Sequence, residues 1–124
     1  MKLSQRNGEY LFVYGTLKRG FSNHHYLKTA RYIDEAKTQQ AFALYTIEYP
    51  FLAKTPILYQ VQGELYLIDN DDLVQVDLLE QHPDDYCREL IEVVTSGGQI
   101  VNAWTYFHPH PQGRLLEHGL FIEQ

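Results

Sequence analysis

The chain has 124 residues, of which 44% are hydrophobic and 21% charged, so it is long enough for one domain with its own hydrophobic core. Its formal net charge of −6, with no basic run longer than Lys18-Arg19, argues against a nucleic-acid partner. No stretch approaches the roughly 20 apolar residues that cross a membrane, and the single cysteine, Cys87, excludes an internal disulfide and a thiolate metal cluster. We therefore expect residues 1–124 to form one cytoplasmic domain without a membrane partner.

The first third of the chain predicts a strand, a short helix and a second strand. Residues 9–14, with the sequence EYLFVY, form a β-rich run between two glycines. Ser22 or Asn23 then caps a short helix that ends at residue 28. Residues 31–45 have strand propensity, and two prolines punctuate the loop that follows.

A strand and the one clear helix occupy the middle of the chain. Residues 59–68 alternate between apolar and polar side chains, as a strand does, and Gly63 within them marks a bulge or a close backbone approach. Residues 69–81 predict a helix, which Asn70 or Asp71 caps. The acidic residues at its N-terminal end suit the helix dipole.

Two further strands are predicted at residues 88–94 and 99–107, and the sequence Ser96-Gly97-Gly98 between them is a hairpin signal. The tail beyond His108 follows no clear pattern. Many strands with about two helices indicate an α+β fold, in which the sheet can curl into a small barrel.

One carboxylate of the predicted helix falls on the face that should pack inward. At about 100° per residue, Glu80 lies between Leu73 and Val76, in the last turn before His82-Pro83 ends the helix. A buried carboxylate without a partner is costly, and its pKa rises. Two interpretations stay open: Glu80 reaches water or pairs with Arg88, or it is a general acid or base tuned towards neutral pH.

The loop after the first strand comes close to the phosphate-binding pattern G-x-x-x-x-G-K-[ST], from Gly15 to Ser22. Phe21 occupies the position where that loop needs a lysine, and no long amphipathic helix follows, so we do not expect a nucleotide. A glycine turn after a strand still leaves backbone N–H groups free to bind a carboxylate or another anion. The six histidines show no recognisable metal-ligand spacing, and we expect neither a metal nor a cofactor.

The loop and the helix end together resemble a known family. The stretch VYGTLKRG from Val13 to Gly20, followed by Asn23 and Leu27, resembles the V-Y-G-[TS]-L-[KR]-x-G…N…L signature of the γ-glutamylcyclotransferase-like superfamily. Three later stretches agree with the family in order and rough spacing: VQGELY at 61–66, the segment at 79–88 and AWTY at 103–106. Within the superfamily, the chain resembles the small γ-glutamylamine cyclotransferase-like branch most.

This resemblance implies a compact mixed, barrel-like β-sheet with a few flanking helices, and a cavity that opens beside the first loop. Glu80 matches the family's catalytic glutamate, and Tyr86 and Arg88 match positions that shape or brace the site. The γ-glutamyl unit of the substrate would lie against the backbone of the first loop, formed by Tyr14, Gly15, Thr16 and Leu17.

Two departures from the family pattern fall near this site. Gln81 stands where glycine or a small acidic residue is common, and Gly119-Leu120-Phe121 replaces the frequent Gly-Asp-Trp-type ending. The first bears on how closely the helix end approaches the cavity. The second bears on the lid and on the leaving-group side.

The resemblance implies a γ-glutamyl cyclotransferase, which closes a γ-glutamyl amide to 5-oxoproline and releases the amine, with Glu80 as general acid and base. The partner is then a small-molecule γ-glutamyl substrate, and we expect a monomer or weak dimer. The alternative, which the two departures favour, is a non-catalytic binding or regulatory module that keeps the cavity. The sequence leaves open which amine is released, and whether the loop N–H groups bind a carboxylate or an oxyanion.

Overall fold

The computed structural model describes residues 8–82, 84–110 and 112–122. None of the helices within these ranges is long and apolar enough to cross a membrane. The elements in chain order are β1 (Glu9–Val13), the 3₁₀ helix η1 (His24–Leu27), β2 (Arg31–Thr38), β3 (Ala43–Thr46), β4 (Pro50–Ala53), β5 (Gln62–Ile68), α2 (Asn70–Glu80), β6 (Cys87–Thr95), β7 (Ile100–Phe107) and β8 (Arg114–Leu115).

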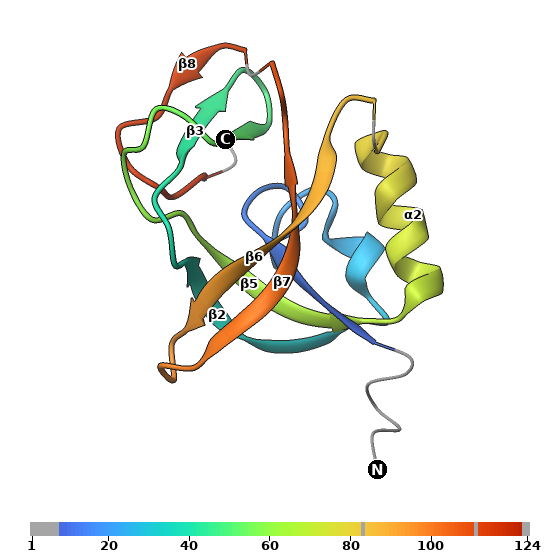
Figure 1. The fold of residues 1–124 in the computed structure, drawn as a ribbon. Coiled ribbons are helices and arrows are strands. Elements are labelled where there is room, and N and C mark those ends of the chain that lie inside the picture. The colour runs from blue at the N-terminus through green and yellow to red at the C-terminus, as the bar shows by residue number, and fades with distance from the viewer. Residues whose placement is uncertain (1–7, 83, 111, 123–124) are drawn as a thin grey trace.

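Five of the strands close into a barrel in the order β1-β5-β2-β6-β7 (Figure 1). Neighbouring strands run antiparallel except at the closure, where β1 pairs parallel to β7 with Leu11 opposite Trp104. A second, three-stranded sheet has the order β4-β3-β8. The architecture confirms the predicted α+β fold with a barrel-like sheet.

The prediction of one strand over residues 31–45 is wrong in its length. The structure divides this stretch into β2 of the barrel and β3 of the small sheet, with a corner after Thr38. The buried Thr38 hydroxyl donates to the Gln40 carbonyl at 2.6 Å and accepts from the Val61 N–H at 2.9 Å, so the side chain replaces ladder hydrogen bonds there. Pro50 begins β4 instead of lying in a loop, which suits a residue without an N–H group.

The predicted long helix is present as α2, but its cap differs from the prediction. Asp69 is the capping residue, and its carboxylate accepts from the Asp72 N–H at 2.8 Å. Asn70 and Asp71 already lie within the helix, whereas Asp69 has the extended backbone that a capping residue needs (φ −78°, ψ 167°). Pro83, which we expected to stop the helix, lies outside the described residues.

The predicted short helix is η1, a single turn that is tied back to the first loop. Asn23 occupies its capping position but makes no side-chain capping bond. The Asn23 amide donates instead to the Thr16 hydroxyl at 2.9 Å, and the Asn23 backbone N–H donates to the Thr16 carbonyl at 2.9 Å. The side chain therefore holds the loop and not the helix.

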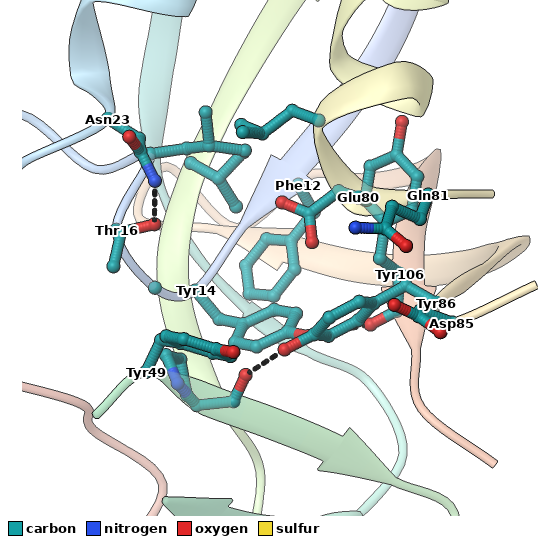
Figure 2. A pocket seen from close by; sticks show the side chains of 15 residues that line it. Phe12, Tyr14, Thr16, Asn23, Tyr49, Glu80, Gln81, Asp85, Tyr86 and Tyr106 are labelled. Atoms are coloured by element: carbon teal, nitrogen blue, oxygen red, sulfur yellow. Dashed lines mark hydrogen bonds between the residues drawn. The ribbon is translucent and has the colours of Figure 1, made fainter. Parts of the chain in front are cut away.

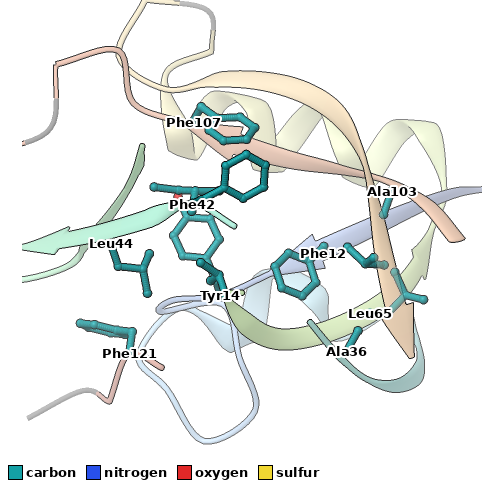
Figure 3. Packing of buried hydrophobic residues seen from close by; sticks show 12 residues of the cluster. Phe12, Tyr14, Ala36, Phe42, Leu44, Leu65, Ala103, Phe107 and Phe121 are labelled. Carbon is teal, nitrogen blue, oxygen red and sulfur yellow. The ribbon is translucent and has the colours of Figure 1, made fainter. Parts of the chain in front are cut away.

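Two hydrophobic clusters pack on opposite faces of β1. Phe12 belongs to the first cluster, which fills the barrel together with side chains of β2, β5 and β7 (Figure 3). Leu11 belongs to the second, in which Leu73 and Val76 of α2 pack against the outside of the barrel. Alternate residues of one strand thus anchor the barrel interior and the helix.

Gly63 shows a close backbone approach, one of the two features that its place in the strand pattern predicts. A Cβ atom at this position would lie 2.2 Å from the Val13 carbonyl oxygen and 2.8 Å from the Phe12 ring. β5 also pairs with β2, and the bulge of that pair lies elsewhere, between Tyr32 and Asp34 of β2. Glycine is therefore required at position 63, where β5 lies close against the end of β1, the strand that leads into the first loop.

We expect Gly63→Ala to lower the free energy of unfolding by about 3 kcal/mol, because the backbone atom that it meets cannot move without disturbing the β1–β5 pairing. Urea-induced unfolding measures the loss. Gly97→Ala is the matched control, since its Cβ would meet its nearest neighbours at 3.8 Å, and we expect a change within about 0.5 kcal/mol. Equal losses in the two variants would contradict the steric argument.

Candidate active site

A cavity of about 270 Å³ lies between the first loop, the β3–β4 turn, the end of α2 and β7 (Figure 2). None of the described residues that line it is basic, and two are acidic. The lining consists of Phe12, Val13, Tyr14, Gly15, Thr16, Leu17, Asn23, Tyr49, Pro50, Leu79, Glu80, Gln81, Asp85, Tyr86 and Tyr106.

Glu80, the last residue of α2, directs its carboxylate into this cavity (Figure 2). The side chain is half-buried, and it forms no hydrogen bond or ion pair with any residue that the structure describes. Removal from water raises the pKa of Glu80 from its ordinary value of 4.5 to about 7. Both protonation states are therefore populated at neutral pH, which suits a group that takes up and returns a proton.

Asp77, one turn earlier on α2, has the opposite environment. Its carboxylate accepts two hydrogen bonds from the Arg88 guanidinium, at 2.9 Å from Nε and 3.0 Å from Nη2, and a third from the Tyr106 hydroxyl. This pairing excludes the interpretation in which Arg88 neutralises Glu80. One carboxylate at the helix end is fully paired and the other is left free.

Two tyrosine hydroxyls of the cavity are anchored to backbone carbonyls. The Tyr14 hydroxyl donates to the Tyr106 carbonyl at 2.6 Å, and the Tyr86 hydroxyl donates to the Pro50 carbonyl at 2.9 Å. Burial, and to a lesser extent the Glu80 charge, raises the pKa of both phenols well above its ordinary value. Each phenol therefore stays neutral. The Tyr14 oxygen already accepts from the Leu52 N–H, whereas the Tyr86 oxygen keeps lone pairs with which it can accept a hydrogen bond from a ligand.

The first loop offers backbone donors on the facing wall. The N–H groups of Gly15, Thr16 and Leu17 carry no hydrogen bond to any described residue, although the next N–H, of Lys18, donates to the Gly15 carbonyl at 3.0 Å. Gly15 cannot be replaced here, because a Cβ atom would lie 2.6 Å from Cγ of Pro50. Free N–H groups at a tight turn form a site for an anionic oxygen.

Lys18 does not serve as a phosphate ligand in this loop. Its side chain is buried, and Nζ donates to the Phe121 carbonyl at 2.8 Å. Phe21, which stands in the lysine position of the phosphate-binding pattern, packs against the Phe121 ring with 6.1 Å between centroids. The altered C-terminal ending therefore supports the loop from behind and does not line the cavity.

The helix ends in a left-handed residue at the rim of the cavity. Gln81 has φ 56° and ψ 44°, and the following N–H, of His82, donates to the Asp77 carbonyl at 2.9 Å. This closure is typical of helices that end in glycine, because a side chain is strained in the left-handed region. Glycine at this position would relieve the strain.

Six of the predicted site residues line the cavity. Arg88 does not line it and is bound to Asp77 instead. Sequence reasoning missed Tyr49, Asp85 and Tyr106. Tyr106 stands in the AWTY stretch, where alternation along β7 could have indicated an inward side chain. Tyr49 lies in a turn between two short strands, and no local pattern identifies it.

The chain is similar to known proteins over most of its length. Residues 11–122 match the family model described as "Gamma-glutamyl cyclotransferase, AIG2-like". The chain belongs to this family. The match spans both walls of the cavity, from the first loop to β7.

Several relatives cover most of the chain. A protein of Methanocaldococcus jannaschii, named as a predicted gamma-glutamylcyclotransferase, is 38% identical over 112 residues, which is 90% of this chain and 93% of the relative. Gamma-glutamylaminecyclotransferase A of Danio rerio is 35% identical over 107 residues, which is 77% of this chain and 66% of that protein. The crystal structure of an AIG2-like protein from Mus musculus superimposes with a TM-score of 0.77 at 30% identity, covering 83% of this chain and 78% of that one.

The raised pKa of Glu80 predicts a specific pH dependence of stability. The folded state holds the Glu80 proton more tightly than the unfolded chain does, so this group lowers the free energy of unfolding as the pH rises from 4.5 through 7. Relative to Glu80→Gln, we expect the wild type to lose about 3 kcal/mol between pH 4.5 and pH 8. Urea unfolding at several pH values measures this, with Glu92→Gln at an exposed strand position as the control. A difference that stays constant with pH would refute the assignment.

The left-handed backbone of Gln81 predicts that glycine stabilises the protein at this position and destabilises it within the helix. Gln81→Gly relieves the strained backbone, and we expect it to raise the free energy of unfolding by about 0.5–1 kcal/mol. Gln75→Gly, at an exposed position within α2, should lower it by about 1 kcal/mol. Thermal and urea unfolding of the two variants check the signs, and destabilisation at both positions would contradict the prediction.

Proposed function

We propose that the protein cyclises a γ-glutamyl amide to 5-oxoproline and releases the amine, with Glu80 as general acid and base. Membership of the γ-glutamyl cyclotransferase family supports cyclotransferase activity. The observation that carries the finer proposal is the unpaired, half-buried Glu80 carboxylate, which faces a loop with three free N–H groups across one cavity.

The reaction moves two protons from the attacking nitrogen to the leaving nitrogen. The α-amine of the substrate attacks its own γ-carbonyl carbon, the ring C–N bond forms and the amide C–N bond breaks. Glu80 as a carboxylate takes the proton that the α-ammonium must lose and returns it to the leaving nitrogen. The regenerated carboxylate then takes the second proton, which the attacking nitrogen loses on ring closure, and passes it to the released amine. Such proton transfer contributes about 10²–10⁴-fold. The attacking and attacked atoms belong to one molecule, so the cavity needs to hold only a folded conformer.

The two walls suit the two ends of a γ-glutamyl group. Glu80 and the phenol oxygen of Tyr86 are acceptors, and they complement the α-ammonium. The free N–H groups of the first loop are donors. Two anionic groups of the substrate suit these donors, the α-carboxylate and the oxyanion that develops on the γ-carbonyl.

The charge of the cavity lining also affects which leaving groups the site can accept. Asp85 and Glu80 are acidic and no described lining residue is basic, so a carboxylate on the leaving side has no counter-charge in the cavity. The nearby Arg88 is paired with Asp77, and Lys18 is bound to the Phe121 carbonyl. We therefore propose that amides of amines without a carboxylate are better substrates than amides of amino acids.

The test is a panel of γ-glutamyl amides with neutral, cationic and carboxylate-bearing leaving groups, with 5-oxoproline read by mass spectrometry. We expect release by the wild type, fastest from the amides that lack a carboxylate on the leaving side. Glu80→Gln should lower turnover by at least about 100-fold while 5-oxoproline still binds, because glutamine keeps the shape but cannot accept the proton.

The control for folding is the far-UV spectrum and the unfolding midpoint of the variant. Near-normal turnover by a folded Glu80→Gln protein would exclude the proton-shuttle role. Release from amino-acid amides at the rate of amine amides would exclude only the leaving-group preference.

A non-catalytic binding module is the second candidate. The observation that favours it is Gln81, a strained residue at the rim where the family commonly has glycine. Calorimetric titration with 5-oxoproline, together with the product assay above, separates the two. Binding without lactam release from any member of the panel would favour the module.

A further inference from the structure

We propose that Asp77 and the Tyr106 hydroxyl are positioning residues that hold the end of α2 so that Glu80 stays directed into the cavity. We call Asp77, Arg88 and Tyr106 the Asp77 clamp. The inference rests on the proposed role of Glu80, and it adds residues that do not exchange a proton with the substrate.

The clamp gives one carboxylate three hydrogen bonds. Oδ1 of Asp77 accepts from Nε of Arg88 at 2.9 Å and from the Tyr106 hydroxyl, and Oδ2 accepts from Nη2 of Arg88 at 3.0 Å. The two charged side chains expose only 14% and 19% of their surface. A bidentate pair with so little exposure fixes orientation as well as distance.

Arg88 is itself held on two sides. Its guanidinium lies 4.4 Å from the centre of the Trp104 ring, and its backbone N–H donates to Nδ1 of His82 at 3.0 Å. Trp104 in turn donates from Nε1 to Glu9 at 2.9 Å. The arginine therefore attaches the last turn of α2 to the paired strands β6 and β7.

Tyr106 joins the two walls of the cavity. Its hydroxyl holds Asp77 on the wall that carries Glu80, and its carbonyl accepts the Tyr14 hydroxyl at the start of the opposite wall. No other described residue of the lining makes both links. A displacement of this side chain would change the distance between the proton-transfer group and the loop donors.

The Glu80 side chain depends on this support because it makes no hydrogen bond of its own to a described residue. Its carboxylate has no partner among the described residues, so the position of the helix end alone directs it. A misplacement of about 1 Å can cost about 100-fold in rate. The Glu80 carbonyl accepts from the Tyr86 N–H at 3.2 Å. The clamp, three residues earlier on the same helix, adds the side-chain contacts that hold this end of α2.

The experiment compares three variants with the wild type on an amide that the wild type turns over. Tyr106→Phe removes one hydroxyl, and Asp77→Ala removes its acceptor. Tyr66→Phe is the matched control, because its hydroxyl also donates to a carboxylate, Glu64, at 2.8 Å, but it lies outside the cavity lining. We expect Tyr106→Phe and Asp77→Ala each to lower kcat about 10- to 100-fold with KM within twofold, and Tyr66→Phe to change neither.

The double variant separates positioning from direct contact. If Tyr106 acts through Asp77, the double variant loses no more than either single variant. A loss of kcat in Tyr106→Phe alone, with Asp77→Ala active, would mean that the hydroxyl contacts the substrate, and it would overturn the proposal. Wild-type kcat in Tyr106→Phe would overturn it as well.

A second measurement does not depend on activity. Carbon-detected NMR titration follows the Glu80 carboxyl, whose pKa of about 7 reflects its removal from water. Tyr106→Phe changes no charge, so we expect the midpoint to fall towards the ordinary value as the helix end loosens, and to stay unchanged in Tyr66→Phe.

The ionisable groups that surround Glu80 are Tyr14 from the end of β1, Tyr49 from the β3–β4 turn, Asp77 from α2, Asp85 and Tyr86 before β6, and Tyr106 from β7.

The two proposals fail in different ways. Absence of 5-oxoproline release by the wild type would refute the proposed function, and the titration would still test the clamp. An unchanged midpoint in Tyr106→Phe would refute the clamp even if the wild type is active.

Discussion

Closure of the barrel between β1 and β7 is the contact on which the candidate site depends. Because these two strands run parallel, their C-terminal ends meet at the same end of the barrel, with Leu11 opposite Trp104. Tyr14 and Tyr106, 92 positions apart, come within a 2.6 Å hydrogen bond there. The first loop, which leaves β1, and the end of α2, which is tied to β7, face each other across the cavity as a result.

The last turn of α2 carries two carboxylates, of which one is paired and the other has no partner among the described residues. Asp77 is fully paired, and its ion pair stabilises the last turn, whereas Glu80 is kept from water without a partner at a cost of about 3 kcal/mol above pH 7. The burial of Leu73 and Val76 against the barrel offsets such a cost. The fold can thus maintain a carboxylate that is partly protonated at neutral pH.

Much of the fold follows from local patterns. The alternation in β5, the hairpin glycines between β6 and β7 and the length of α2 were all predictable, because each depends on neighbours in the chain. The division of residues 31–45 into β2 and β3 was not, since the Thr38 hydroxyl bonds both to Gln40 and to the distant Val61, which precedes β5. The cap at Asp69 was missed by one residue for a local reason, the backbone angles that only the coordinates give.

The sequence by itself determined which groups are available: the glycine turn at Gly15, a glutamate on the apolar face of a helix, and the motifs that indicate the family. Only the tertiary structure decided which of them meet. It paired Arg88 with Asp77 and so left Glu80 free, and it brought Tyr106 to the cavity. These outcomes depend on strand pairing between distant segments, which the spacing of residues along the chain does not encode.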